Sequence, residues 1–312
     1  MKIIFMGTPD FSVGALEALV AADHQVVLVV TQPDKPKGRG KEMQMTPVKE
    51  CALKHNIPVF QPVKVKDAEA VETLRSYGAD AFIVAAFGQI LSEEILTMPK
   101  YGCINIHASL LPKYRGAGPI QWVILDGEKE TGITIMQMDK GIDTGDMLLQ
   151  RVVPIDEKET GDSLHDKLAR AGAELIVEAL SKIEAGEITP VKQNDAESCY
   201  AKMLQKSMGR IDWEKDAKQI ERMVRGLNSW PSAYTTYHGK NLKIWESSVC
   251  ENDKLPENAK PGMITAVEKD AFYVQTGEKT LKVTSVQLEG KKRMAVKEFL
   301  LGCQMKAEEV LE

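Results

Sequence analysis

The sequence predicts an α/β fold, with a Rossmann-like, mostly parallel sheet followed by a small OB-like β-barrel. Two patterns favour this class. Short, almost continuously apolar runs alternate with helical stretches in the first part, as expected for strands covered on both faces. Short alternating strands with glycine or charged turns fill the last part, as expected for a small barrel. Over 312 residues we expect a first domain at 1–187, a linker at 188–206 and a second domain at 207–312.

The first domain repeats a strand–helix unit. Thr46 and Asp67 fit as helix caps, and Pro47 fits the first turn of its helix. Such repeats place parallel strands in one sheet with helices on both sides, and ligands bind at the carboxyl ends of the strands. The expected strands are 2–6, 25–31, 80–87 and 102–107, and the expected helices are 12–23, 46–56, 67–78 and the long 159–186.

The second domain reads as one helix followed by a β-rich segment. Residues 188–206 have no sustained period and are expected to be extended. A helical pattern covers 214–228. The expected strands are 232–237, 241–249, 262–267, 271–276 and 280–286.

Composition narrows the class further. A net charge of −5 and 27% charged residues are ordinary for a folded soluble protein. The apolar runs are too short to cross a bilayer or to serve as a signal peptide. Five widely spaced cysteines without a C-x-x-C pair argue against a zinc site or a disulfide framework. We therefore expect a cytoplasmic monomer with no metal and no membrane contact.

Asn105 and His107 stand out in "CINIHASLLPKYRGAGPI". They lie two residues apart on one strand, so both side chains face the same way, about 6.5–7 Å apart along the chain. A lone histidine is more often a satisfied core residue, but an asparagine beside it at a strand end favours a site. An amide N–H can donate to a developing oxyanion, and an imidazole can move a proton. Cys103 on the same face reads as a small buried residue.

Acidic residues follow another apolar strand, "GITIMQM". Asp139, Asp143 and Asp146 could simply form a polar turn. They would reach the Asn105 and His107 strand if the two strands were neighbours. A carboxylate placed there can orient a histidine and stabilise its charged form.

These segments resemble the folate-dependent formyltransferases, whose shared pattern is N-x-H, then SLLP, then a distant D-T-G-D. The resemblance extends to "FMGTPDFS", "TQPDKPKGRGKEMQMTPVK", "RIDW" and "NSWPSAY". Tyr234 stands where a tryptophan is common. The resemblance covers the chain without a large unmatched segment.

The resemblance implies a donor, an acceptor and a set of site residues. The donor is 10-formyltetrahydrofolate, no metal is required, and the acceptor is the amine of initiator methionyl-tRNA, for translation initiation. Asn105, His107 and Asp143 are implied as catalytic, with the general base left open between His107 and Asp143. The implied folate-site residues are Ser109, Leu110, Leu111 and Pro112, and the implied tRNA-binding residues are Arg39, Lys35, Lys37 and Lys41.

Other readings remain open at this point. A formyltransferase for a sugar nucleotide or glycinamide ribonucleotide would share N-x-H and D-T-G-D. A non-catalytic RNA-binding protein could use the second domain and the basic run 31–41, which taken alone reads as a solvated loop. Because residues 207–312 are nearly neutral, RNA binding there would need local patches such as 289–294 or the helix bearing Lys218, Arg222 and Arg225.

Overall fold

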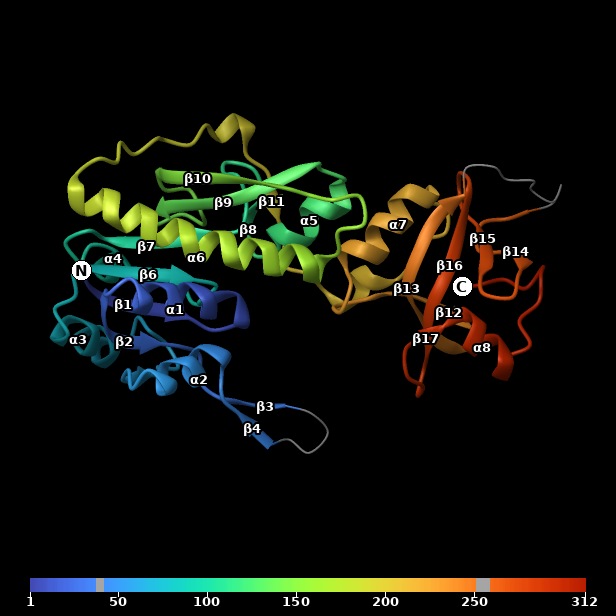
Figure 1. Ribbon diagram of the computed structural model, residues 1–312, viewed down its shortest axis with the longest axis horizontal. Helices are drawn as coiled ribbons and strands as arrows, with labels where there is room; N and C mark the ends of the chain where they lie inside the picture. The colour runs from blue at the N-terminus through green and yellow to red at the C-terminus, as the bar shows by residue number, and fades with distance from the viewer. Residues whose placement is uncertain (38–41, 251–258) are drawn as a thin grey trace. The chain divides into compact units, whose positions relative to one another are not determined.

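The computed structural model describes residues 1–37, 42–250 and 259–312 and divides into two compact units (Figure 1). The first unit comprises Met1–Pro119, Glu130–Pro154 and His165–Ala201. The second comprises Ile120–Lys129, Ile155–Leu164 and Lys202–Glu312. Two short stretches that precede residue 202 in the chain therefore belong to the C-terminal unit.

A seven-stranded sheet forms the centre of the first unit in the described residues, in the order β10-β9-β7-β6-β1-β2-β5. Neighbours from β5 to β7 are parallel, whereas β9 and β10 join one edge in the antiparallel direction. The predicted mostly parallel sheet is confirmed. The strand bounds are β1 Lys2–Gly7, β2 Gln25–Val30, β5 Val59–Phe60, β6 Ala81–Ala85, β7 Cys103–His107, β9 Glu130–Gln137 and β10 Met147–Pro154.

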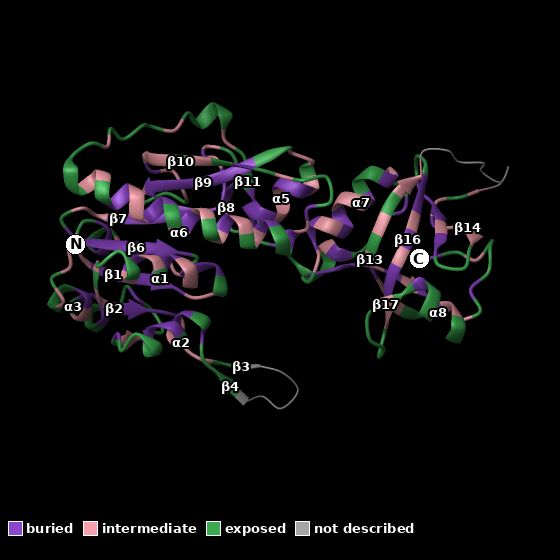
Figure 2. Cartoon of the chain, in the orientation of Figure 1, coloured by how far each residue is buried: buried purple, intermediate pink, exposed green. Residues whose placement is uncertain are grey.

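Helices cover both faces of this sheet, so its central strands are almost wholly buried (Figure 2). On one face, a Cβ at Gly172 of α6 would meet the Ile106 side chain of β7 at 2.9 Å, which leaves room only for glycine. On the other face, Leu74 of α3 and Ile95 of α4 share a core cluster with Ile4. The helix bounds are α1 Val13–Ala21, α2 Pro47–Lys54, α3 Ala68–Ser76, α4 Glu93–Leu96 and α6 Gly161–Ala185, whereas α5 Pro119–Asp126 lies almost entirely in the second unit.

One of the two predicted helix caps is present. The Thr46 hydroxyl accepts a hydrogen bond from the Lys49 N–H at 3.2 Å, and Pro47 opens α2 as expected. Asp67 occupies the N-cap position of α3, but its side chain makes no capping bond, so that prediction is wrong in this respect.

Two segments expected to lack regular structure contain short strands. The basic run forms part of a hairpin, in which β3 (Lys35–Lys37) pairs with β4 (Glu42–Gln44). The segment expected as an extended linker contains β11 (Tyr200–Ala201), which pairs in parallel with β8 (Arg115–Gly116). Strands of two or three residues are too short to show a period, which explains why sequence patterning missed them.

The second unit is built on an antiparallel sheet in the order β12-β13-β16-β15-β14, with β17 beside β16. The predicted small β-domain is confirmed, including all five expected strands. Ile220 of α7 and Phe299 of α8 pack into its core. The bounds are α7 Ala217–Gly226, β12 Ala233–Tyr237, β13 Lys240–Cys250, β14 Ile264–Val267, β15 Phe272–Gln275, β16 Thr280–Leu288, β17 Met294–Ala295 and α8 Val296–Gly302.

Short 3₁₀ turns complete the described elements, at Asp10–Ser12, Asp195–Glu197 and Lys206–Gly209. None of the helices in the described ranges combines the length and the apolarity that crossing a bilayer requires.

Candidate active site

Asn105 and His107 lie at the end of β7 with their side chains nearly buried, at 9% and 5% exposure. Their neighbours on the strand, Cys103, Ile104 and Ile106, belong to the core. A buried polar group is costly unless it is hydrogen-bonded, so partners for both side chains are expected. Both have partners, and both meet the same carboxylate.

That carboxylate is Asp143, in the turn between β9 and β10. Asn105 Nδ2 donates to Asp143 Oδ1 at 3.4 Å, and His107 Nδ1 lies 3.6 Å from Asp143 Oδ2. The Gly116 N–H donates to the same Oδ2 at 2.9 Å. The structure therefore brings together the three residues that sequence analysis selected as a catalytic set.

Strand direction determines how Asp143 reaches this position. β7 and β9 are antiparallel, with Ile104 opposite Gln137 and His107 opposite Thr134. The chain therefore leaves β9 beside the start of β7, and the turn must fold back to place Asp143 near His107. Asp143 does so with a φ of 54°, a left-handed conformation that is uncommon for a non-glycine residue.

The proton on His107 can be assigned from its partners. Nε2 lies 2.9 Å from the carbonyl oxygen of Tyr114. Because a carbonyl only accepts, Nε2 must carry a hydrogen. Nδ1 is then the nitrogen that can exchange a proton, and it faces Asp143 Oδ2. Any proton that this histidine accepts would therefore enter at Nδ1, beside the carboxylate.

Three successive residues of the loop after β7 connect the site to the rest of the unit. Tyr114 contributes its carbonyl to His107, and Gly116 its N–H to Asp143. Arg115, 4% exposed, donates from Nε to Gln193 Oε1 at 3.0 Å. Gln193 Nε2 in turn donates to the carbonyls of Asp143 and Gly145 at 2.8 and 2.7 Å. Sequence analysis missed Arg115 and Gln193.

The other two aspartates of the turn play different parts. Asp139 Oδ1 accepts from the Gly141 N–H and the Thr144 hydroxyl, at 3.0 and 2.6 Å. It shapes the turn rather than facing His107. Asp146 takes part through its main-chain carbonyl, which accepts from the Gln137 N–H.

The residues expected at the folate site form a tight turn. Ser109 is fully buried, and its hydroxyl donates to the Lys113 carbonyl at 2.7 Å. The Leu111 N–H donates to the Thr134 hydroxyl, so Leu111 is also turned inward. Leu110 and Pro112 are half-exposed, and these two offer apolar surface to a ligand.

Burial leaves Cys103 and Cys51 protonated near neutral pH. It raises the pKa of Cys103 to about 12. Burial, followed by the charge of Glu17, raises the pKa of Cys51 to about 11. Because the thiolate is the nucleophilic form, neither residue is suited to nucleophilic catalysis. The sequence-based reading of Cys103 as a small buried residue is confirmed.

The cations expected to contact tRNA fall on the hairpin of β3 and β4. Lys35 is exposed on β3, and Lys37 ends that strand. Arg39 and Lys41 lie outside the described residues. Asp34 directly precedes β3, and its carboxylate accepts from Lys49 Nζ and Gln61 Nε2 at 2.5 and 2.7 Å.

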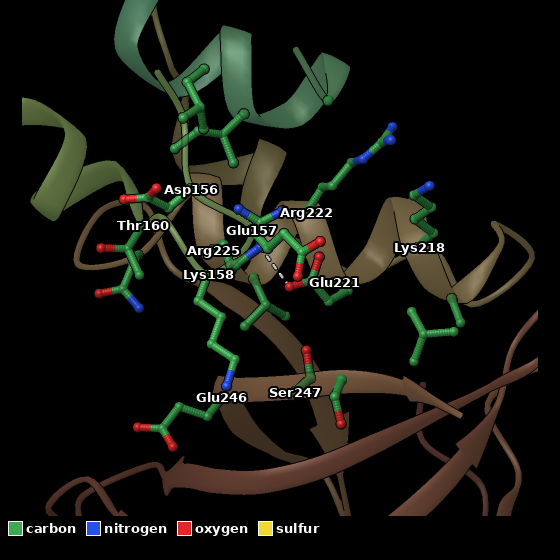
Figure 3. A pocket seen from close by; sticks show the side chains of 18 of the residues that line it. Asp156, Glu157, Lys158, Thr160, Lys218, Glu221, Arg222, Arg225, Glu246 and Ser247 are labelled. Atoms are coloured by element: carbon green, nitrogen blue, oxygen red, sulfur yellow. Dashed lines mark hydrogen bonds and ion pairs between the residues drawn. The ribbon is translucent and has the colours of Figure 1, made fainter. Parts of the chain in front are cut away.

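The second unit holds a wide polar cavity of about 1090 Å³ (Figure 3). Of its cations, Arg225 donates to the Glu159 carbonyl at 2.6 Å, and Arg222 to the Asp126 carbonyl at 3.4 Å. These two arginines, expected from sequence to bind RNA, therefore make contacts within the unit. Lys218 on the same helix is exposed, as are Lys291 and Lys292.

A Rossmann-like sheet bearing an Asn, His and Asp cluster beside SLLP defines a formyl-transferring class of enzyme, and comparison with known proteins agrees. The formyl transferase family model matches residues 1–180, and the formyl transferase C-terminal domain model matches residues 203–304. The chain belongs to the formyl transferase family. A methionyl-tRNA formyltransferase of Agathobacter rectalis is 55% identical over 98% of this chain and 97% of its own length. That of Clostridioides difficile is 49% identical over 97% of each chain.

Solved structures share the fold at lower identity. WlaRD, a sugar 3N-formyl transferase, superposes with a TM-score of 0.68 at 21% identity, over 94% of this chain and 99% of that one. HypX from Aquifex aeolicus gives a TM-score of 0.66 at 21% identity, over 98% of this chain and 49% of that one. At such identity these structures support the fold alone.

Proposed function

We propose that this protein transfers the formyl group of 10-formyltetrahydrofolate to the amine of initiator methionyl-tRNA, in the cytoplasm and as a monomer. The observation that carries the proposal is the convergence of Asn105, His107 and Asp143, in a chain that matches methionyl-tRNA formyltransferases along nearly its whole length. HypX has been solved with tetrahydrofolic acid, and an N-formyltransferase of Helicobacter canadensis with folinic acid. These structures support folate as the carrier.

The residues suit attack of an amine on a formyl carbon. A bond forms between the amine nitrogen and that carbon, negative charge develops on the formyl oxygen, and the bond to the folate nitrogen then breaks. Asn105 Nδ2 carries two hydrogens, and its contact with Asp143 uses one. The other can donate to the developing oxyanion, where one such donor contributes about 10²–10³-fold in rate.

The proton lost by the attacking amine must reach the leaving nitrogen. We assign this transfer to the pair of Asp143 Oδ2 and His107 Nδ1. His107 Nε2 already donates to the Tyr114 carbonyl, so it is not the free basic nitrogen. Nδ1 can accept the proton from the amine because the neighbouring carboxylate stabilises the imidazolium that forms, and the imidazolium can then give the proton to the leaving nitrogen.

Arg115 and Gln193 are positioning residues in this proposal. Asp143 has a strained backbone conformation within a folded-back turn. Gln193 donates hydrogen bonds to two main-chain carbonyls of that turn. Arg115, adjacent to Gly116, donates a hydrogen bond to Gln193. The catalytic carboxylate and the loop that contacts it are therefore held by one set of hydrogen bonds.

For the acceptor, we propose that the hairpin cations Lys35, Lys37, Arg39 and Lys41 contact the RNA end near the site. Arginine pairs bidentately with phosphate or stacks on a base, so Arg39 is assigned the main contact. Ser109, Leu110, Leu111 and Pro112 are proposed to shape the folate site, with Leu110 and Pro112 touching the carrier.

A competition assay tests the function. Purified protein is offered formyl-folate together with methionyl initiator tRNA, glycinamide ribonucleotide and an amino-sugar nucleotide. We expect formylation of the tRNA. Formylation of either small amine in preference would overturn the proposed acceptor, and formylation of none would overturn the enzymatic proposal.

A further inference from the structure

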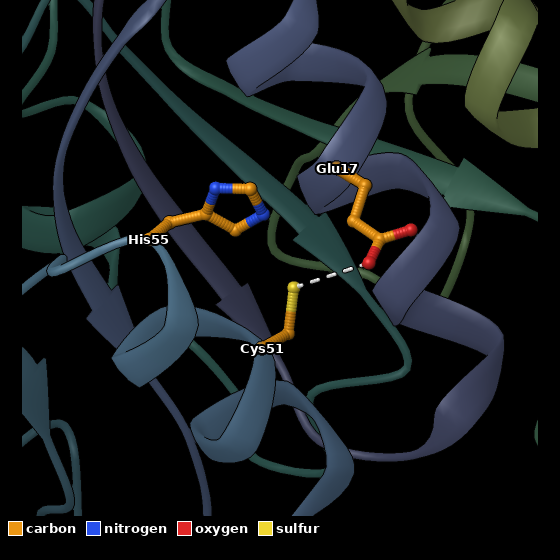
Figure 4. A group of neighbouring side chains, drawn as sticks. All are labelled: Glu17, Cys51 and His55. Carbon is orange, nitrogen blue, oxygen red and sulfur yellow. Dashed lines mark hydrogen bonds between the residues drawn. The ribbon is translucent and has the colours of Figure 1, made fainter.

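Glu17, Cys51 and His55 converge on one point between α1 and α2 (Figure 4). Their donor atoms, one carboxylate oxygen, one sulfur and one ring nitrogen, all lie within 4.8 Å of one another. Among the residues that the structure describes, this is the group of three or more His, Cys, Asp and Glu side chains whose donor atoms lie this close together. It plays no part in the proposed formyl transfer.

Local structure explains the convergence. Cys51 lies on α2 and His55 is its C-cap residue, four positions later, so both side chains fall on one helix face. Glu17 comes from α1, which packs against α2. Cys51 is buried, whereas Glu17 and His55 are exposed. The point between the three donors is therefore reachable from solvent on one side.

The spacing of the donors is close to that of a metal centre. Zinc binds sulfur at about 2.3 Å and nitrogen or oxygen at about 2.0–2.2 Å, so tetrahedral ligands lie roughly 3.3–3.7 Å apart. Cys51 Sγ already lies 3.9 Å from Glu17 Oε1, to which the thiol donates. Coordination would therefore require the exposed side chains of Glu17 and His55 to move inward from a separation of up to 4.8 Å.

We propose that Glu17, Cys51 and His55 bind a divalent cation of the zinc class, with the fourth coordination position left to water. Thiolate and imidazole favour zinc, cobalt or nickel over magnesium and calcium, which prefer all-oxygen sites. On binding, the S–H bond of Cys51 breaks, its proton passes to solvent, and a sulfur–metal bond replaces it. No electron transfer is involved.

The cation would fasten α1 to α2 in the first unit. Because α2 begins directly after the hairpin of β3 and β4, a bound metal would also restrain the helix from which the hairpin extends. The positive charge of Lys54 lowers the pKa of the Cys51 thiol and so partly opposes the effects of burial and of Glu17. Sequence analysis argued against a zinc site because the chain has no C-x-x-C pair. That argument does not apply to a Cys-x₃-His pair on one helix whose third ligand comes from a second helix.

Cobalt is the direct probe, because a thiolate bound to Co²⁺ gives a charge-transfer band and tetrahedral Co²⁺ gives intense visible bands. Reduced, metal-free full-length protein is titrated with Co²⁺ and then with Zn²⁺. We expect both sets of bands to saturate at one Co²⁺ per chain and to be abolished by Zn²⁺. Absence of a thiolate band would overturn the proposal.

Variants locate the site. Cys51→Ser should abolish the charge-transfer band, and His55→Gln, at an exposed position that does not threaten folding, should weaken Co²⁺ binding on the order of ten-fold or more. Matched controls are Cys303→Ser and His165→Gln, the latter removing a histidine that faces Asp10 and Asp166. Unchanged binding in His55→Gln, or loss of the band in Cys303→Ser, would contradict the assignment.

Discussion

Asp143 has an unfavourable backbone conformation, and the contacts that this residue makes depend on that conformation. A non-glycine residue in the left-handed region costs about 1–3 kcal/mol and persists only where its surroundings hold it. Its carboxylate meets Asn105, His107 and the Gly116 N–H, and its carbonyl meets Gln193. The strained residue is therefore the one on which the proposed site converges.

Substituting this carboxylate tests its role directly. Asp143→Asn keeps the size of the side chain but removes the charge that faces His107 Nδ1. We expect turnover in the tRNA formylation assay to fall by about 10²–10³-fold, with folate affinity largely kept. The matched control is Asp139→Asn in the same turn, since an amide oxygen can still accept from Gly141 and Thr144. Near-parent turnover of Asp143→Asn would remove it from the catalytic set.

At the scale of elements, the site depends on segments that have weak sequence signals. The segment after α6 pairs with the loop after β7 through β11 and β8, and its Gln193 reaches the turn between β9 and β10. Its key bonds go to main-chain carbonyls. Such bonds help to fix the turn that carries Asp143, one of the proposed catalytic groups.

Substituting Gln193 by glutamate tests separately the two hydrogen-bonding roles of this side chain, as acceptor from Arg115 and as donor to the turn. In Gln193→Glu a carboxylate can still accept from Arg115 Nε, but nothing donates to the carbonyls of Asp143 and Gly145. We expect a lower kcat with an unchanged KM for formyl-folate and a melting temperature close to the parent. Lys192→Ala, an exposed neighbour, is the control. Equal effects on kcat and KM, or an effect confined to melting, would indicate a purely structural role.

Sequence reasoning succeeded where periodicity or a long motif carried the signal. The strands around Phe5, Ile83 and Ile106 were predicted by apolar runs, and Asn105 and His107 by their place at a strand end. Gln193 lies in a segment without periodicity, so nothing in the sequence distinguished it from a linker residue. The antiparallel direction of β9, which forces the turn to fold back, likewise depends on tertiary pairing.

At the scale of the whole molecule, the boundary between the units is not a single point in the chain. Residues 120–129 and 155–164 belong to the C-terminal unit. Leu125 packs against its core, and Ser229 Oγ donates to Asp162 Oδ1 at 2.7 Å. A cut near residue 206 removes the partners of both stretches.

A fragment ending at residue 206 should therefore melt below the intact chain, because it exposes Leu125 and loses these contacts. Leu125→Ser should destabilise the full chain but improve the solubility of the fragment, since the side chain packs partly buried against the C-terminal core in the full chain and loses that cover in the fragment. Thermal melts and solubility of all four proteins check this. A destabilising effect of Leu125→Ser in the fragment as well would contradict it.

Stability should also fall in alkali. The pKa of Cys103 is raised from 9.0 to about 12 in the folded protein. Above pH 9 the unfolded chain releases this proton while the folded protein retains it, so the free energy of unfolding falls by up to about 1.4 kcal/mol per pH unit until the folded thiol ionises. Urea unfolding under reducing conditions should show a shallower decline for Cys103→Ala than for the parent. An identical decline would contradict the assignment.

The hydrogen bonds from Gln193 to the turn at Asp143 also have a consequence for the stage of synthesis at which the proposed site can form. Asn105, His107 and Asp143 leave the ribosome early, but the side chain that fixes the turn is made fifty residues after Asp143. A nascent chain that ends before it has every proposed catalytic group and lacks the bonds that set their geometry. We therefore expect a nascent chain to gain formyl-transfer activity only after the segment that follows α6 has emerged and paired with the loop after β7.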